Sequence, residues 1–183
     1  LANRFSYFSD FAPRSTFYPP CRVEAAVTAI GRAKYRISLL AYAYDRPAIH
    51  ACVVHAHHKG VSVVVIVDYW QVNRSSTRMA ERLLDLIHNG IEVRLWRIDA
   101  LVGQRFDKGS ERYPNGKSGI TSAMHAKQCL IDNGVVVGGS MNWTENSANN
   151  NLENLSVSQY LDEVAAACFE HHRTYIESKL FSE

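Results

Sequence analysis

The sequence predicts an α/β fold with a mixed, mostly parallel central sheet flanked by helices. Apolar strand-like runs alternate with helical patterns along most of the chain, which implies parallel neighbours joined by right-handed crossovers. A hairpin signal, Asp132-Asn133-Gly134, joins two further runs that must pair antiparallel. With 183 residues and 46% hydrophobic content, the chain fits a single domain over residues 1–183 with one core.

The first part of the chain supplies two helices, each followed by a strand. Apolar residues at helical spacing predict a helix over 22–34, and a strand-like run covers 36–44. Pro47 opens a second helix that ends at Gly60. The β-branched run 61–68 is suited to a central strand covered on both faces. Residues 1–20 are interpreted as an N-terminal extension.

The remaining elements follow the same patterns. They are a helix over 77–88, strands over 91–98, 124–131, 135–140 and 153–160, and a terminal amphipathic helix over 162–180. The two middle strands form the hairpin, because Asn133-Gly134 readily supplies the positive φ values of a tight turn.

Residues 100–122 form a long basic loop without apolar periodicity. A connection of this length in a compact domain is usually functional or mobile, and its place before His125 puts it at the mouth of a site. The net charge is only +2, but basic residues predominate in the segment from Arg94 to Lys127. They are Arg94, Arg97, Arg105, Lys108, Arg112, Lys117 and Lys127. Such a strip would attract a polyanion, although each residue could equally belong to an ordinary solvated loop.

A cluster of polar residues on the predicted hairpin carries the chemistry. The residues are His125, Lys127, Asp132, Gly139, Ser140 and Asn142, in the spacing His-x-Lys-x4-Asp-x6-Gly-Ser-x-Asn. Side chains two apart on a strand point the same way, so each strand contributes one pair to a common patch. The patch combines a nucleophile, a cation and two neutral phosphate-binding groups, which can break a phosphodiester bond without a metal.

This spacing resembles the signature of the phospholipase D superfamily at every named position. The segment Asn151-Leu152-Glu153-Asn154 also resembles the stretch in which a Glu follows the family's motif. The layout from Arg22 to Tyr160 is similar to the small bacterial Nuc-type and mitochondrial-type nucleases of that superfamily. The resemblance implies a phospholipase D-like fold, with no cofactor and no metal.

The resemblance also implies a two-step mechanism. Neutral His125 would attack phosphorus and form a phosphohistidine intermediate. Lys127, Ser140 and Asn142 would bind the non-bridging oxygens of the transition state. Glu153 would accept a hydrogen bond from the other imidazole nitrogen and fix its tautomer. Asp132 completes this catalytic set, and its place at the turn favours a structural brace over a proton carrier.

The departing alkoxide needs a proton, which the family takes from a second His in a second copy of the motif. No other His-x-Lys occurs in this chain. We therefore expect a homodimer with its twofold axis through the active site. There His125 of the partner subunit would act first as general acid and then as the base for water.

The motif indicates that the chain cleaves a phosphodiester bond, but it does not determine which class of molecule contains that bond. A short chain with one motif resembles the nuclease branch, which predicts a metal-independent endonuclease of low sequence specificity for DNA, RNA or both, with single strands favoured if the cleft is narrow. The alternative is a cardiolipin-type phospholipase D, which would contact a membrane through an anchor upstream of Leu1. A third class, a nucleic-acid-binding module with a dead site, is disfavoured because the catalytic residues are intact.

Further substrate contacts are assigned to Trp143, which could stack on a base, and to the loop cations Arg105 and Lys117. Tyr42 lies near a strand end that could ring the same cleft, but core packing is the expected use of Tyr42 and Trp96. Clustered histidines at 55, 57 and 58 are interpreted as a solvated helix end rather than a metal site. The four cysteines have no metal-binding spacing, and we expect buried free thiols.

The location of the protein in the cell depends on what precedes Leu1. The chain begins without Met, so a signal removed upstream would place it in the periplasm or outside the cell. Otherwise we expect an intracellular or organelle-anchored protein. The longest apolar run, 61–67, is far shorter than the roughly 18 residues that cross a bilayer.

Overall fold

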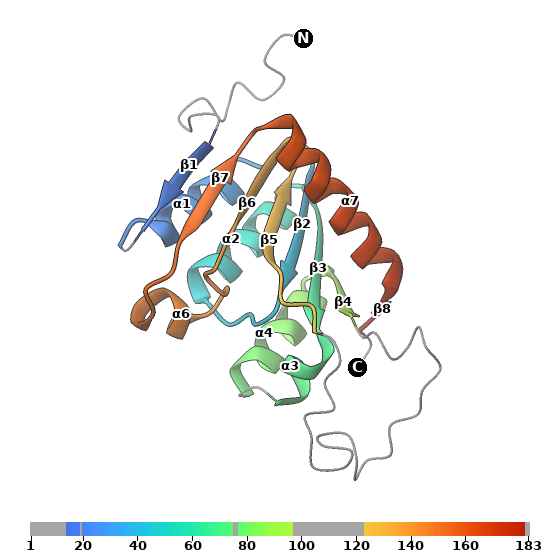
Figure 1. Cartoon of the computed structure of the whole chain (residues 1–183). Helices are drawn as coiled ribbons and strands as arrows, with labels where there is room; N and C mark the ends of the chain where they lie inside the picture. Colours follow the sequence, from blue (N-terminus) through green and yellow to red (C-terminus); the bar gives the residue numbers. More distant parts are fainter. Residues whose placement is uncertain (1–13, 19, 75–76, 97–122, 182–183) are drawn as a thin grey trace, which may run out of the picture.

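The computed structural model describes residues 14–18, 20–74, 77–96 and 123–181, which build one eight-stranded sheet in the order β1-β7-β6-β5-β2-β3-β4-β8 (Figure 1). The strands are β1 (Arg14–Phe17), β2 (Arg36–Ala41), β3 (Ser62–Asp68), β4 (Glu92–Trp96), β5 (Lys127–Ile131), β6 (Val135–Gly139), β7 (Leu155–Ser158) and β8 (Ser178–Leu180). The helices are α1 (Arg22–Gly31), α2 (Pro47–His58), α3 (Tyr69–Arg74), α4 (Thr77–His88), α6 (Glu145–Asn150) and α7 (Leu161–Glu177).

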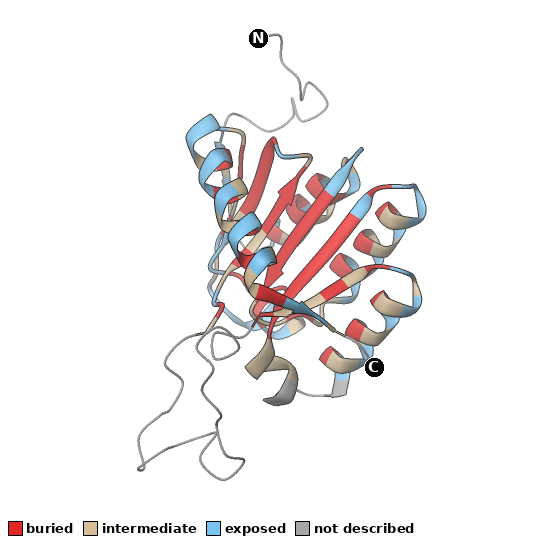
Figure 2. Ribbon diagram, turned by 90° about the vertical axis from the view of Figure 1, so that its right-hand side faces the viewer, coloured by how far each residue is buried: buried red, intermediate tan, exposed pale blue. Residues whose placement is uncertain are grey.

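Helices cover both faces of the sheet. The larger core lies between the sheet and α1, α2 and α4, while α7 packs on the opposite face over two smaller clusters. Figure 2 shows the central strands in red, buried between these two layers. Within the described ranges, no helix combines the length and the apolar character needed to cross a membrane.

The sheet is mixed, as expected, but its balance differs from the mostly parallel sheet that the sequence predicts. Among the strands of the described residues, parallel neighbours are β2, β3 and β4, and the other neighbouring strands pair antiparallel. The parallel strands are those joined by helical crossovers through α2 and α4. The tight turn between β5 and β6 permits only antiparallel pairing of these two strands.

Short elements account for most of the differences from the predicted boundaries. Strand β1 lies within the expected extension, because its residues pair with β7 at the sheet edge. The terminal helix ends at Glu177, and the next residues form β8 against β4. There the Arg94 guanidinium donates from Nε to Ser178 Oγ at 2.7 Å and from Nη2 to the Ser178 carbonyl at 2.8 Å.

The cysteines are free thiols, as expected, although only Cys129 is fully buried. Cys21 is exposed, and Cys52 and Cys168 are half-buried. The expectation of burial rested on Cys52, Cys129 and Cys168, and it holds fully for Cys129 alone among them.

Candidate active site

His125 and Lys127 lie against each other where β5 begins. The Lys127 ammonium donates from Nζ to His125 Nδ1 and to the His125 carbonyl oxygen, both at 2.8 Å. Lys127 is buried while His125 is exposed, so the ammonium lies beneath the imidazole and the ring faces solvent. Burial lowers the pKa of Lys127, and the nearby charge of Glu153 opposes that shift.

The His125 imidazole is held in its neutral form. Burial lowers the pKa of His125 below its ordinary value, and the Lys127 charge lowers it further. The carboxylate of Asp68 acts in the opposite direction, but the net shift is downward. A neutral imidazole has a lone pair on one ring nitrogen, which is the requirement for a nucleophile at physiological pH.

The contact with Lys127 determines the tautomer of this neutral ring. An ammonium can only donate, so Nδ1 must accept and the single ring proton resides on Nε2. Attack through Nε2 requires the other tautomer, in which Nδ1 carries the proton and donates it to an acceptor. The described residues of one chain thus hold His125 in the tautomer whose proton is on Nε2.

Glu153 is placed differently from the sequence-based expectation. Its carboxylate accepts hydrogen bonds from Ser147 Oγ and Asn151 Nδ2, each at 3.2 Å, and from the Ser140 side chain. The bond from Ser140 is the main reason why its pKa is lowered. Among the described residues it shares no hydrogen bond with His125, because the network around Ser147 holds the carboxylate and Lys127 occupies Nδ1.

Ser140 and Asn142 follow the end of β6 and connect with this acidic network. The Ser140 hydroxyl accepts the backbone N–H of Asn154 at 3.0 Å, and the Asn142 backbone N–H donates to Ser147 Oγ at 3.0 Å. The Asn142 side chain keeps a buried Oδ1 for which the described part of the chain provides no partner. Gly139 is required here, since any Cβ would collide with the Asn154 carbonyl oxygen.

Tyr42 is a site residue that the sequence analysis assigned to core packing. It follows β2, and its ring packs edge-on against the His125 ring, with centroids 4.4 Å apart and planes at 62°. The Lys127 Nζ lies 5.0 Å from the Tyr42 centroid, within cation–π range. The signal that could have identified it is its position just beyond the carboxyl end of a central strand, where ligand sites gather in α/β sheets.

Asp68 anchors the backbone that leads into His125. It is fully buried at the end of β3, and its two oxygens accept the N–H groups of Met124 at 2.9 Å and Gln71 at 3.0 Å. A carboxylate that satisfies two backbone donors rigidifies the approach to the imidazole. Asp68 thus caps the first turn of α3 and holds the segment that leads into His125.

Asp132 lies at the far end of the hairpin and acts as a structural brace. Its carboxylate accepts the backbone N–H groups of Lys34, Tyr35 and Arg36 at 2.8 to 3.0 Å. Asp132 and Asn133, rather than Asn133 and Gly134, adopt the positive φ of 54° in the turn. Asp132 follows β5 and His125 precedes it. The separation of seven residues between these two positions corresponds to roughly 20 Å along a strand.

Replacing Asp132 with alanine should lower the free energy of unfolding by about 2–3 kcal/mol, because three backbone donors lose a charged acceptor. Asn at the same position keeps one acceptor oxygen and tolerates the positive φ, so its loss should be smaller. Urea denaturation of both variants checks this. Equal stability of the alanine and asparagine variants would show that the carboxylate does not brace the turn.

Trp143 does not contribute an exposed ring, which corrects its assignment to substrate binding. It is fully buried in the main core, and its indole N–H donates to the Leu40 carbonyl at 3.0 Å. The apolar ring fills the space between β2 and the turn after β6, so no face remains for a base. Arg105 and Lys117, and with them the long basic loop, lie outside the described residues.

Arg22 supports the site from beneath and was missed by the sequence analysis. Although it is a cation, it is 1% exposed and donates to the carbonyl oxygens of Ser147, Ala148, Asn151 and Glu153. These bonds cap the C-terminal end of α6 and fix the segment that presents Glu153. Its signal was its place on the apolar stripe of α1, in phase with Ala25, Ala26 and Ala29.

Comparisons with known proteins agree with this architecture. The family model described as cardiolipin synthase, PLD-like domain, matches residues 26–172. Mitochondrial cardiolipin hydrolase of Mus musculus is 25% identical over 167 residues, which cover 86% of this chain and 63% of that protein. The Homo sapiens protein of the same name is 26% identical over 149 residues, covering 76% and 48%. The chain thus spans less than two thirds of the length of these curated relatives.

Solved structures give the same fold over nearly the whole chain. Nuc of Salmonella typhimurium, a phospholipase D family member, superposes with a TM-score of 0.73 at 20% identity and covers 93% of this chain and 98% of its own. NucT of Helicobacter pylori gives a TM-score of 0.70 at 22% identity, with coverage of 92% and 98%. At these identities the likeness establishes the fold.

Among the described residues, no three His, Cys, Asp or Glu side chains gather as they would to hold a metal ion. The groups that do gather are the imidazole of His125, the ammonium of Lys127, the amide of Asn142 and the hydroxyl of Ser140. They lie at one end of the neighbouring strands β5 and β6, where β5 begins and β6 ends. The family match includes all of them together with Glu153. Sequence spacing, site geometry, fold and family model thus agree that this chain belongs to the phospholipase D superfamily.

Proposed function

We propose that this phospholipase D-superfamily phosphodiesterase is an endonuclease of low sequence specificity that cleaves DNA, RNA or both without a metal. The observation that carries the proposal is the contact between the Lys127 ammonium and the neutral His125 imidazole. It joins a nucleophile and a phosphate-binding cation in one partly solvent-exposed pair.

In the first step His125 Nε2 attacks phosphorus, a bond from nitrogen to phosphorus forms, and the bond from phosphorus to the leaving oxygen breaks. Lys127, Asn142 and Ser140 stabilise the charge on the non-bridging oxygens. The leaving alkoxide takes a proton from the imidazolium of His125 of the partner subunit. In the second step that imidazole removes a proton from water, which attacks phosphorus and releases His125.

The tautomer of His125 supports a two-chain site. Within one chain Lys127 donates to Nδ1, which leaves the proton on Nε2. In this tautomer Nε2 carries the ring proton and has no lone pair for attack, so an isolated subunit is not poised as the nucleophile. A nucleophilic His125 needs an acceptor for Nδ1–H, and Glu153 of the partner subunit is the carboxylate that a twofold axis through the site could supply.

Nucleic acid is favoured as substrate by the likeness to Nuc and NucT, which share this fold over 93% and 92% of the chain. A cardiolipin-type phospholipase D is the second candidate, because the family model and both curated relatives carry cardiolipin in their names.

One experiment separates the two substrates. The chain is incubated in EDTA with labelled single-stranded DNA, single-stranded RNA, duplex DNA and vesicles that contain cardiolipin. We expect cleavage of nucleic acid, fastest on single strands, and no release of phosphatidic acid. Hydrolysis of cardiolipin alone would replace the nuclease proposal by the lipid one, and loss of cutting in EDTA would falsify the metal-independent mechanism.

Replacing Lys127 with methionine should lower kcat about 10²- to 10³-fold, the usual cost of one lost donor to a transition-state oxyanion. It should also move the acidic limb of kcat/KM to higher pH. Burial and the Lys127 charge lower the pKa of His125, so the wild-type imidazole stays neutral below its ordinary value of 6.5. Without the charge that pKa rises, and protonation inactivates the nucleophile at a higher pH.

The matched control for Lys127 is Lys59→Met, which removes an exposed ammonium at the end of α2. It should change neither kcat nor the pH profile. The Lys127 variant should sediment as a dimer, since the ammonium acts on the imidazole and the substrate. An acidic limb that stays in place in Lys127→Met would contradict the proposed electrostatic role.

Replacing Tyr42 with leucine should lower kcat about tenfold, because ring stacking and the cation–π contact together contribute on the order of 1.4 kcal/mol. Phenylalanine keeps the ring and should stay close to wild type. The effect should fall on kcat rather than KM if Tyr42 positions the catalytic pair. Steady-state kinetics of both variants measure this, and equal losses in Phe and Leu would point to the hydroxyl instead of the ring.

A further inference from the structure

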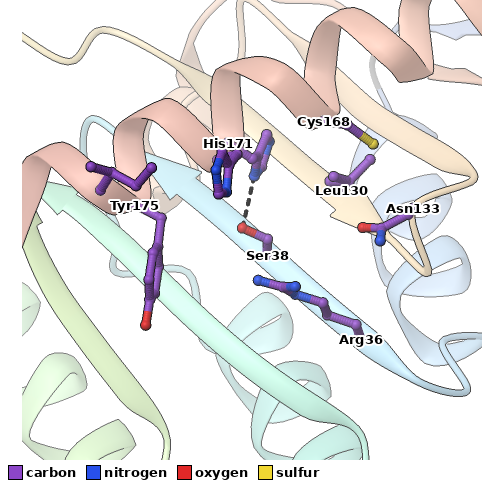
Figure 3. A pocket seen from close by; sticks show the side chains of 9 residues that line it. Arg36, Ser38, Leu130, Asn133, Cys168, His171 and Tyr175 are labelled. Atoms are coloured by element: carbon purple, nitrogen blue, oxygen red, sulfur yellow. Dashed lines mark hydrogen bonds between the residues drawn. The ribbon is translucent and has the colours of Figure 1, made fainter.

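A second pocket lies under α7, on the face of the sheet opposite the main core (Figure 3). Its volume is about 440 Å³, within the range of small-molecule sites. Arg36 and Ser38 line it from β2, Asn133 from the hairpin turn, and His171 and Tyr175 from α7. Three separate segments therefore contribute polar groups to one cavity.

This pocket is distinct from the catalytic site. Arg36 is the first residue of β2, whereas Tyr42 follows the opposite end of that strand. Likewise Asn133 is at the turn of the hairpin, and His125 precedes its first strand. The two sites are thus separated by roughly 20 Å along the strands.

The lining of the pocket carries a positive charge from Arg36, an exposed residue at the start of β2 whose backbone N–H is bound by Asp132. The described part of the chain offers the Arg36 guanidinium no ion pair, and no Asp or Glu is among the lining residues. The remaining polar groups are a serine hydroxyl, an asparagine amide, a cysteine thiol, two histidines and a tyrosine hydroxyl. An unpaired guanidinium with neutral donors around it is suited to an oxyanion.

His171 adds a buried donor without a partner. The residue is 3% exposed, and its Nδ1 is 2.8 Å from Ser38 Oγ, the contact drawn as a dashed line in Figure 3. Burial, aided by the Arg36 charge, lowers the pKa of His171 to about 3, so the ring is neutral near pH 7.

The hydrogen bond with Ser38 assigns the proton of this ring. Within the described ranges the Ser38 hydroxyl makes its side-chain hydrogen bond to His171 alone, so its proton is satisfied only if Nδ1 accepts it. The ring proton is then on Nε2, which is buried and has no hydrogen-bond partner in the described part of the chain. Such a donor is costly unless a ligand or water satisfies it.

We propose that this pocket binds a phosphate group, either free or carried on a small organic molecule. Arg36 would take two of its oxygens in a bidentate contact, and Asn133 and the Nε2–H of His171 would donate to the others. Because Nε2 is shielded, a lining side chain must shift to admit the ligand, and we expect this to be Ile176, which is 66% exposed. The volume accommodates an organic group beside the phosphate.

Calorimetric titration of the full chain with inorganic phosphate, AMP and adenosine tests this proposal. The protein carries Lys127→Met, so that the catalytic site contributes little anion binding. We expect phosphate and AMP to bind at one site, and Arg36→Gln to weaken both about tenfold or more, as expected for a lost charged hydrogen bond. The control Arg173→Gln removes an exposed guanidinium on α7 outside the pocket and should change nothing.

The outcomes distinguish the sources of the phosphate. Tighter binding of AMP than of phosphate supports a carried group, and equal binding supports the free ion. The proposal is overturned if adenosine binds as tightly as AMP, or if Arg36→Gln and Arg173→Gln bind phosphate alike. Nuclease activity of Arg36→Gln in the otherwise wild-type chain should be unchanged, because Arg36 is remote from His125.

Discussion

Alanine at position 125 should leave the chain folded and reduce phosphodiester cleavage by at least about 10⁴-fold, the scale of loss when an enzyme loses its nucleophile. The imidazole is exposed and contributes little to the core, so the melting temperature should hardly change. Lys127 and Asn142 remain, but without the nitrogen nucleophile no intermediate forms. Single-turnover cleavage of a labelled oligonucleotide measures the loss.

The same substitution in one subunit of a dimer tests the shared site. Each proposed site needs two copies of His125, so a heterodimer with one alanine subunit should lose nearly all activity. Differently tagged subunits allow its purification, and His58→Ala, an exposed histidine at the end of α2, is the control. A heterodimer with half of the wild-type rate would mean that each chain works alone.

The second large effect is expected at Arg22, where a substitution should strongly lower the stability of the fold. Replacing Arg22 with methionine leaves four carbonyl oxygens without their donor, and we expect a loss of about 3–4 kcal/mol in the free energy of unfolding. For a chain of this size that corresponds to a melting temperature lower by roughly 10 °C. Cleavage should fall as well, because the segment that holds Glu153 loses its anchor.

Two further variants make the Arg22 prediction specific. Lysine keeps the charge but cannot reach four carbonyls with one ammonium, so it should recover only part of the stability. Arg14→Met removes an exposed arginine whose partner is Glu163, and a surface pair contributes at most about 1 kcal/mol. If Arg22→Met unfolds at the same urea concentration as Arg14→Met, the buried guanidinium is not a structural anchor.

Much of the fold could be predicted because the apolar residues of its longer helices and strands recur at regular spacing in the sequence. The amphipathic pattern of α4 gave its bounds, Thr77–His88, directly, and the β-branched run of β3 gave a doubly covered strand. The short edge strands β1 and β8 could not be predicted, because their few residues carry no period of their own. Their pairing depends on β7 and β4, which a local pattern does not reveal.

The site residues differ in the same way. Fixed spacing identified His125, Lys127 and Asn142, since chemistry constrains those side chains. Trp143 was misassigned because its position next to Asn142 in the sequence does not determine whether its side chain points to the site or to the core. In the structure the ring is buried in the core. Tyr42 reaches the imidazole from another strand, so only the sheet order β5-β2 brings it into the site.

The most direct test is the detection of a covalent intermediate on His125. A short oligonucleotide is mixed with excess enzyme, the reaction is quenched in alkali to preserve the acid-labile bond from nitrogen to phosphorus, and the protein mass is measured. We predict that a fraction of the chain gains one nucleotide fragment, mapped to His125 and absent from His125→Ala. Efficient cleavage with no adduct, or an adduct on another residue, would contradict the account.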